Sequence, residues 1–209
     1  MEEDHGARAP KALAQLRRDL CIFNESDLRP KQACLLPDEH VTFATMREAG
    51  VYFVNLQASG ISAKELGRRG FNSAGCYRQL GMDALDLTDG FWARSLVAEL
   101  GAEALRDEFV CSPEEAATLA GSEGADAIGL TVDMALERCA GYPDAAAVVL
   151  RAQPDPVVAL GATSLERLLN TGLRAIALGD LGIGIEQLGA IWNLCPARLR
   201  ALGFSTAAM

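Results

Sequence analysis

Residues 58–72 read ASGISAKELGRRGFN and contain one complete helix-forming unit. Ser62 is a residue type that caps helix N-termini, and Glu65, three positions later, completes the sequence pattern of a capping box. Ile61 precedes the cap and Leu66 follows it at the fourth helical position, so we expect these side chains to pack together as a hydrophobic staple. The stretch predicts a helix of about two turns.

The glycines on either side of this helix belong to a series that recurs roughly every tenth position, with some steps skipped. Such a glycine can adopt the left-handed conformation that ends a helix. An apolar residue usually follows it, and a large apolar residue often precedes it by four positions. Helices this short are marginal alone, so each must bury its apolar stripe on its neighbours, as in a solenoid. The series comprises Gly50, Gly60, Gly70, Gly81, Gly90, Gly101, Gly121, Gly141, Gly161, Gly172, Gly182 and Gly203.

The capping pattern of Ser62 occurs twice more. Ser112 and Glu115 form one instance, with Pro113 at the favoured first helical position. Thr163 and Glu166 form the other. The three patterns lie about fifty residues apart, which indicates a higher-order repeat of five short units.

The segments ASGISAKELGRRGFN and RLRALGFST resemble the short decapeptide helical repeats, of the AGFSAxELrxAGF kind, that occur in algal and protist proteins. The resemblance covers residues 41–101 well and residues 158–205 in part, whereas residues 102–157 depart from it and residues 1–40 do not show it. It implies a fold of short helices and a structural or interaction role, and it implies no catalytic residue.

Composition also favours helices. The chain has 209 residues, with 35 alanines and 29 leucines against 17 valines and isoleucines together. Alanine and leucine favour helices, while β-branched residues favour strands. We therefore predict an all-α fold, a solenoid-like stack of short helices from repeats of about ten residues. A mixed α/β fold is the alternative, because AVVL, PVVAL and RAIALG are apolar enough for buried parallel strands.

The sequence divides into three regions. Residues 1–40 combine an amphipathic helix over residues 7–22 with an irregular connector. Residues 41–121 form a first helical-repeat block. Residues 122–209 form a second block, continuous with the first, and the turn-forming GSEGAD segment marks the break.

Charge and cysteine usage exclude several classes of protein. The formal net charge is −9, from 19 basic and 28 acidic side chains. Nucleic acids and anionic membranes are bound by clustered Lys and Arg, so we expect neither as a partner. No run of about 18 apolar residues is present, so we expect no membrane insertion. The six cysteines contain no CxxC pair, and we interpret them as small buried residues in a reducing intracellular compartment, cytoplasmic or organellar.

We predict no catalytic, cofactor-binding or metal-binding residue. The two histidines, His5 and His40, lie in polar or proline-flanked segments, so a histidine-dependent site has little support. The run GDLGIGIEQLG at residues 179–189 matches neither a dinucleotide-binding motif nor a P-loop, and it is typical of helix-ending turns.

Carboxylate pairs and two cysteines are further chemical candidates. Asp86 and Asp89 resemble a glycosidase pair in spacing, but charges near a turn also explain them. The pair Glu114–Glu115 belongs to a first helical turn, where carboxylates are favoured. Cys111 and Cys195 precede helix starts, which can make a thiol reactive. Other repeat units carry a buried apolar residue at their position.

Three aromatic residues are candidate contacts with a protein partner. Tyr52 and Trp92 stand where a unit normally carries Ser, Thr, Asn or Asp as a cap. At the edge of a solenoid such a ring is less easily covered, and Tyr and Trp dominate interface hot spots. Packing of the rings against residues 23–40 is the alternative. Trp192 is a third candidate.

The function that these observations favour is a non-enzymatic scaffold or assembly subunit, which binds other proteins through the surface of its short-helix repeat. The alternative is a small α/β enzyme or a regulatory ligand-binding domain centred on residues 145–185.

Overall fold

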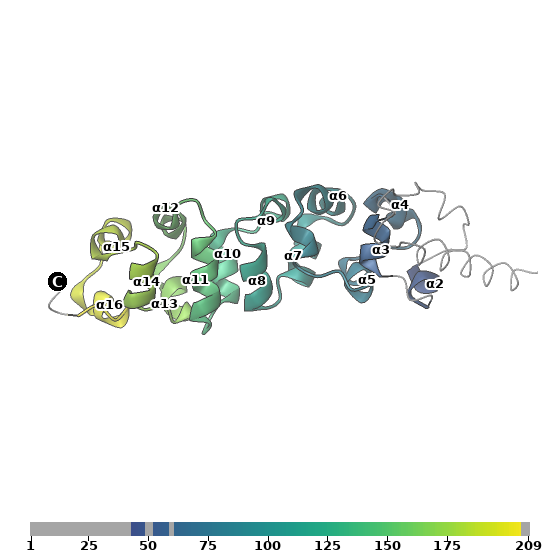
Figure 1. Cartoon of the computed structure of the whole chain (residues 1–209). Helices are drawn as coiled ribbons and strands as arrows, with labels where there is room; N and C mark the ends of the chain where they lie inside the picture. The colour runs from purple at the N-terminus through teal and green to yellow at the C-terminus, as the bar shows by residue number, and fades with distance from the viewer. Residues whose placement is uncertain (1–42, 49–51, 59–60, 206–209) are drawn as a thin grey trace, which may run out of the picture. The chain divides into compact units, whose positions relative to one another are not determined.

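The structure is a computed structural model that describes residues 43–48, 52–58 and 61–205. Every secondary-structure element within these residues is a helix, so the predicted all-α fold is confirmed there (Figure 1). Outside the described residues lie the predicted helix over residues 7–22, the connector up to residue 40, Gly50 and Gly60.

The helices are short, and most have six to nine residues. In chain order they are α2 (Phe43–Glu48), α3 (Phe53–Ala58), α4 (Ala63–Arg68), α5 (Ala74–Gln79), the 3₁₀ helix η1 (Asp86–Thr88), α6 (Gly90–Leu100), α7 (Ala102–Phe109), α8 (Pro113–Leu119), α9 (Glu123–Ile128), α10 (Val132–Arg138), α11 (Pro143–Arg151), α12 (Pro156–Gly161), α13 (Leu165–Thr171), α14 (Ala175–Asp180), α15 (Ile185–Trp192) and α16 (Pro196–Ala201).

The described chain divides into two compact units. Unit 1 comprises the described residues up to Asp83 together with Ser95–Ala104, and it contains α2 to α5. Unit 2 comprises Ala84–Arg94 and the described residues from Leu105 onward, and it contains η1 and α8 to α16. The block boundary predicted at residue 121 falls inside unit 2, between α8 and α9.

The core of unit 1 is built on aromatic rings. The Phe71 ring lies edge-on to Phe43, with centroids 5.3 Å apart, and 5.4 Å from the Tyr77 ring. The Phe53 ring lies edge-on to the Tyr77 ring, with centroids 6.1 Å apart. Aromatic pairs at these separations add to the stability that burial gives, so this cluster links α2, α3 and α5 with the turn after α4.

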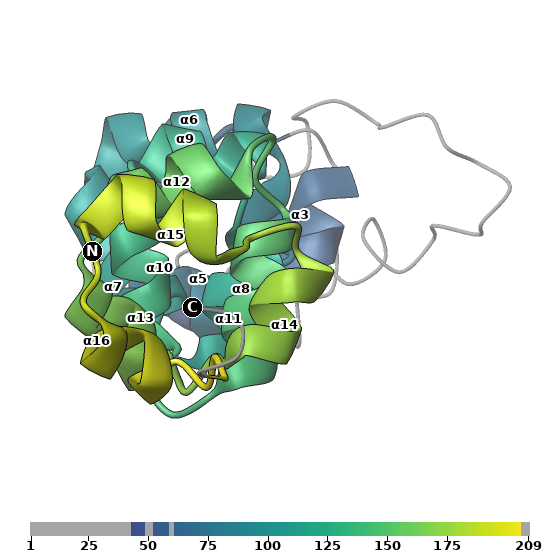
Figure 2. The same ribbon diagram turned by 90° about the vertical axis from the view of Figure 1, so that its left-hand side faces the viewer.

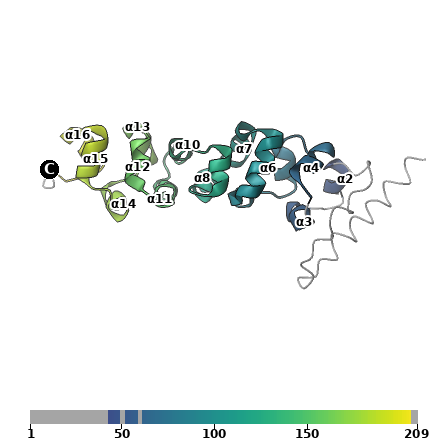
Figure 3. The same ribbon diagram turned by 90° about the horizontal axis from the view of Figure 1, so that it is seen from above.

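In unit 2, helices three places apart in the chain pack on each other. Helix α8 packs on α11, α10 on α13 and α12 on α15, and Figure 2 shows α12 and α15 in one row. Figure 3 shows the helices following one another along the unit from α8 to α16. Pairs that are closer in the chain also pack together, namely α10 with α8 and α11, and α11 with α12. The repeat of five short units, expected from the capping patterns, stays a prediction.

A recurring helix end accounts for four glycines of the series, Gly70, Gly81, Gly182 and Gly203, and also occurs at Gly129, whereas Gly90 begins α6 and Gly161 ends α12 without a positive φ. Gly70 has a φ of +92°, and the N–H of Phe71 beyond it donates to the Leu66 carbonyl at 3.2 Å. This is the Schellman arrangement, which brings the residue after the glycine onto the residue four before it. Phe71 and Leu66 are both buried. The same bond joins Met82 to Tyr77, Leu130 to Ala125, Ile183 to Leu178 and Phe204 to Leu199.

Two of the three predicted caps are present. The Ser62 hydroxyl accepts a hydrogen bond from the Glu65 N–H at 3.2 Å, although the Glu65 carboxylate pairs with Arg68 and Arg69. Ser112 forms the full capping box of α8, with Pro113 at the first helical position. Ile61 and Leu66 are buried, as the predicted staple requires.

The third predicted cap, Thr163, is wrong by one residue. Ser164 caps α13 by accepting a hydrogen bond from the Arg167 N–H at 3.1 Å. Thr163 is buried, and its hydroxyl donates to the Leu160 carbonyl at 3.0 Å. Adjacent Thr and Ser residues both have the chemistry of a cap, and packing decides between them.

The segments considered as strands are helical. AVVL lies in α11, PVVAL lies in α12 and RAIALG leads into α14. Pro143 and Pro156 occupy first helical positions, and the Asp155 carboxylate accepts hydrogen bonds from the N–H groups of Val157 and Val158. These local start signals outweigh the β-propensity of valine. Over the part of the chain that the structure describes, the α/β fold alternative is therefore wrong, including an α/β domain centred on residues 145–185.

Candidate functional site

The three aromatic residues predicted to contact a partner have different surroundings. Tyr52 is 63% exposed, whereas Trp92 is only 9% exposed, so the expectation that both rings stay uncovered is wrong for Trp92. Asp89 caps α6 by accepting a hydrogen bond from the Phe91 N–H at 2.8 Å, which places Trp92 inside the helix. Trp192 is half-buried at the end of α15, where its indole N–H donates to the Thr163 carbonyl at 3.2 Å.

One free N–H group at the start of α3, next to Tyr52, is satisfied from another helix of unit 1. The Phe53 N–H, at the start of α3, donates to the Leu80 carbonyl at 2.8 Å. A Cβ atom at Gly81 would lie 3.6 Å from the Tyr52 ring, so the ring passes close to this glycine. A backbone bond between two helices of unit 1 therefore satisfies the first N–H group of α3.

The carboxylates considered for chemistry mostly begin helices. Asp89 caps α6, Asp155 caps α12 and Glu115 completes the capping box of α8. Gly182 and Gly184 of the GDLGIGIEQLG run form the turn between α14 and α15. His5 and His40 lie outside the described residues. Within the described part of the chain, no group of three His, Cys, Asp or Glu residues could hold a metal ion.

The four described cysteines are free thiols, and only two are buried as predicted. Burial raises the pKa of Cys139 to about 11, while Cys111 and Cys195 are exposed. The Cys111 thiol donates to the Asp107 carbonyl at 2.8 Å. The pKa of Cys195 is lowered, chiefly because the Arg198 backbone N–H faces the sulfur.

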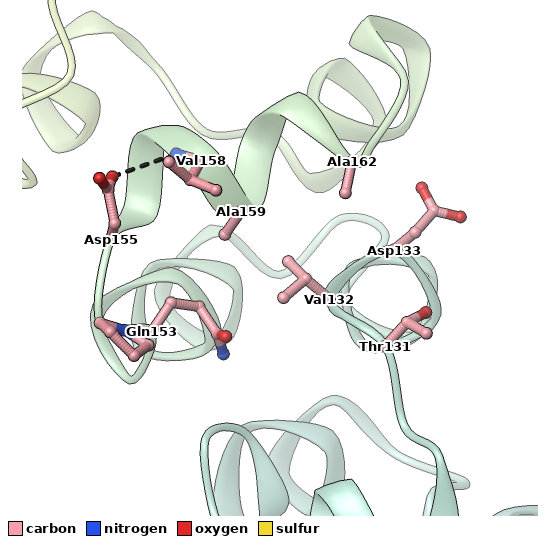
Figure 4. Close-up of a pocket in the computed structure, with 9 residues that line it drawn as sticks. Thr131, Val132, Asp133, Gln153, Asp155, Val158, Ala159 and Ala162 are labelled. Atoms are coloured by element: carbon pink, nitrogen blue, oxygen red, sulfur yellow. Dashed lines mark hydrogen bonds between the residues drawn. The ribbon is translucent and has the colours of Figure 1, made fainter.

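A first groove, which we call the α10–α12 groove, has a volume of about 470 Å³ (Figure 4). Val132 and Val158 supply much of its apolar surface, and Asp133 and Asp155 stand at its rim. Both carboxylates already have partners within the unit. Asp133 pairs with Arg167 at 3.3 Å, and Asp155 caps α12. This groove offers apolar surface with little free charge.

A second groove lies between α8 and α11, with a volume of about 550 Å³, and we call it the α8–α11 groove. Tyr142 and Val148 are apolar residues of its wall, 53% and 44% exposed, and the small side chains of Ala117 and Ala145 leave the space open. Its lining comprises Glu114, Ala117, Gly141, Tyr142, Pro143, Asp144, Ala145 and Val148.

The α8–α11 groove also carries two carboxylates. Glu114 and Asp144 are the second residues of α8 and α11. No Lys or Arg among the described residues pairs with either side chain. This position in the first turn favours a carboxylate through the helix dipole. The site therefore combines exposed apolar side chains with two negative charges that have no partner cation in the described chain.

Sequence reasoning missed this groove, although one local signal for it exists. Tyr142 follows Gly141 in the glycine series, and the repeat pattern favours burial of such a residue. The Tyr142 N–H donates to the carbonyl of Cys139, three residues back, at 3.0 Å. In the Schellman ends the corresponding N–H donates to the carbonyl five residues back. Pro143 follows and disfavours helical backbone at Tyr142, whose φ is −122° and ψ is 77°. The Gly-Tyr-Pro sequence thus marks a helix start at which the ring stays outside.

A comparison of the chain with protein-family models, with curated proteins and with solved structures finds no match. None of the described helices has the length and apolarity needed to cross a bilayer.

Proposed function

We propose that this protein is a non-enzymatic scaffold or assembly subunit, which binds other proteins through the surface of a solenoid-like stack of short helices. The proposal places it in a reducing compartment of the cell, since Cys111 and Cys195 are exposed free thiols. It also retains the likeness to decapeptide helical repeats as the origin of the architecture.

The regular packing of unit 2 supports the architecture. Helix α8 packs on α11, α10 on α13 and α12 on α15, and further contacts join α10 to α8 and α11, and α11 to α12, so these helices pack on near neighbours in the sequence. Such an arrangement leaves one face of each helix toward solvent. The same exposed position is available in successive turns, which is a useful property for a protein that binds extended partners.

The α8–α11 groove is the observation that carries the proposal of protein binding. Its wall presents an aromatic and an aliphatic side chain together, Tyr142 and Val148, which are 53% and 44% exposed. Tyr is enriched among residues that dominate the binding energy of protein interfaces. Exposed apolar residues gathered around a hollow are typical of interaction sites, whereas single ones are ordinary.

Affinity capture of the tagged full chain from its source cells tests this function. The wild type and the Val148→Arg and Tyr142→Ala variants are compared, with the captured proteins identified. Ile176→Arg is the matched control, because Ile176 is also aliphatic and exposed but lies on α14, outside the groove. We expect wild type and control to capture the same proteins and both groove variants to lose them.

Circular dichroism establishes that all the variants remain folded. If the groove variants capture the same proteins as the wild type, binding occurs elsewhere on the chain. If the wild type captures no protein above the background of an unrelated bait, the scaffold function itself is wrong.

A further inference from the structure

We infer that the α8–α11 groove binds a basic protein segment, one that inserts a single apolar side chain between Tyr142 and Val148 and places Lys or Arg beside Glu114 and Asp144. This inference rests on the proposed function, and it specifies the chemistry of the partner.

The shape of the groove favours an apolar anchor. Ala117 on α8 and Ala145 on α11 are small, so the space between Tyr142 and Val148 is not filled by the chain itself. A branched aliphatic side chain inserted there would remove apolar surface of both residues from water, which is the main favourable contribution to most protein association.

The two carboxylates define the charge of the partner. In the α10–α12 groove, Asp133 is neutralised by Arg167 and Asp155 caps a helix. Glu114 and Asp144 have no such use among the described residues, where no Lys or Arg pairs with them. A cation from outside can therefore approach both without displacing an internal partner.

The surrounding chain strengthens this preference. Residues 105–172, which contain both grooves, carry 11 acidic and 4 basic side chains. Among the basic side chains, Arg106 donates to the Ile128 carbonyl and Arg167 is held by Asp133 and Glu137. The field of this region attracts a positively charged segment and repels phosphate. A basic peptide fits the groove, and a nucleic acid does not.

Peptide binding to the full chain, followed by fluorescence anisotropy, tests the inference. The probe is a short labelled peptide with one leucine flanked by lysines in a glycine–serine background. Matched peptides replace the lysines with glutamates or the leucine with alanine. We expect the lysine–leucine peptide to bind and the glutamate peptide not to bind. The affinity should fall as salt is raised.

Protein variants locate the binding site. Glu114→Lys combined with Asp144→Lys should weaken binding of the lysine–leucine peptide about tenfold or more. Glu186→Lys is the control, because Glu186 is likewise an exposed second residue of a helix, here α15, and it lies outside the groove. It changes charge and helix-dipole energy as each single groove substitution does, which is half of the change in the double variant, and it should leave the affinity within about twofold.

A double-mutant cycle tests the apolar anchor. Tyr142→Ala should weaken binding of the leucine peptide more than binding of the alanine peptide, because only leucine contacts the ring. Equal weakening of both peptides would show that the leucine does not enter the groove.

The inference is overturned if the wild type fails to bind the lysine–leucine peptide, or if Glu186→Lys weakens binding as much as the groove substitutions do. These failures are distinguishable from failure of the proposed function. If the groove variants lose their cellular partner while the basic peptide does not bind, the groove is a protein-binding site for a segment of different chemistry.

Discussion

Met82 and Tyr142 each follow a glycine with positive φ, yet Met82 is buried and Tyr142 is exposed. The difference lies in one hydrogen bond. The Met82 N–H donates to the Tyr77 carbonyl, five residues back, whereas the Tyr142 N–H donates to the Cys139 carbonyl, three residues back. Glycine identity is visible in the sequence, but the choice between these bonds depends on the following residue and on packing. The turns were therefore predictable, while the exposure of individual side chains was not.

Cys195 provides a prediction at this scale. Its pKa is lowered chiefly by the Arg198 backbone N–H, so a larger fraction is thiolate near neutral pH than for the same cysteine in the unfolded chain. We expect the pH at which iodoacetamide modification of Cys195 is half-maximal to be lower in the native protein than in urea. Mass spectrometry of labelled peptides measures both profiles.

Internal comparisons sharpen the test of Cys195. Arg198→Ala keeps the backbone N–H, so most of the lowering should persist, and Cys139, whose pKa burial raises to about 11, should stay unlabelled in the native state. A lowered pKa in the folded state stabilises the fold at high pH, and this contribution is lost as pH falls through the folded pKa. Identical profiles in the native protein and in urea would contradict the assignment.

At the scale of helices, starts and ends are fixed by different kinds of information. Ser112 and Pro113 specify the start of α8 locally, and this start was predicted correctly. At the start of α3, which follows Tyr52, the Phe53 N–H donates to the Leu80 carbonyl at 2.8 Å. Leu80 is the residue at which α5, the second helix after α3, ends. No local pattern contains such an acceptor, and the contact of the exposed Tyr52 ring with a partner stays a prediction.

Three glycine-to-alanine substitutions separate the roles that glycine has in these helices. Gly189 lies within α15 with nothing near its missing side chain, so Gly189→Ala should raise stability by about 0.5–1 kcal/mol. Gly70 is also uncrowded but has a φ of +92°, and Gly70→Ala should cost about 1–2 kcal/mol. Gly124→Ala should cost more, since its Cβ would overlap the Leu87 carbonyl where α9 packs on η1.

Urea denaturation at constant m-value gives the three free energies of unfolding. The order Gly189, Gly70, Gly124, from gain to largest loss, is the expected result. A stabilising Gly70→Ala would mean that α4 continues through the glycine and that the spacing of the series has no structural cause.

At the scale of the whole molecule, the sequence predicted where helices form better than it predicted which helices pack on each other. The glycine series indicates where each helix ends, but α8 and α11 are separated by two other helices in the sequence and meet only in the folded chain. Their groove therefore has no contiguous signature, although Tyr142 and Pro143 mark part of it. The division of the described chain near residues 84–105 likewise follows from packing, since no change in composition marks it.

Packing between adjacent turns predicts that damage to one helix stays local. The Leu150 side chain is fully buried in α11, which packs on α8, α10 and α12. Leu150→Ala should cost about 2–5 kcal/mol. In a stack stabilised by neighbouring turns, amide hydrogen exchange should accelerate most in α8 and α10 to α12, and least in α4 and α5 of unit 1. Exchange measured by mass spectrometry on native protein resolves these segments. An equal loss of protection throughout the described helices would show that the chain unfolds as one cooperative body. Packing between neighbouring helices alone would confine the effect of one cavity to the helices around it.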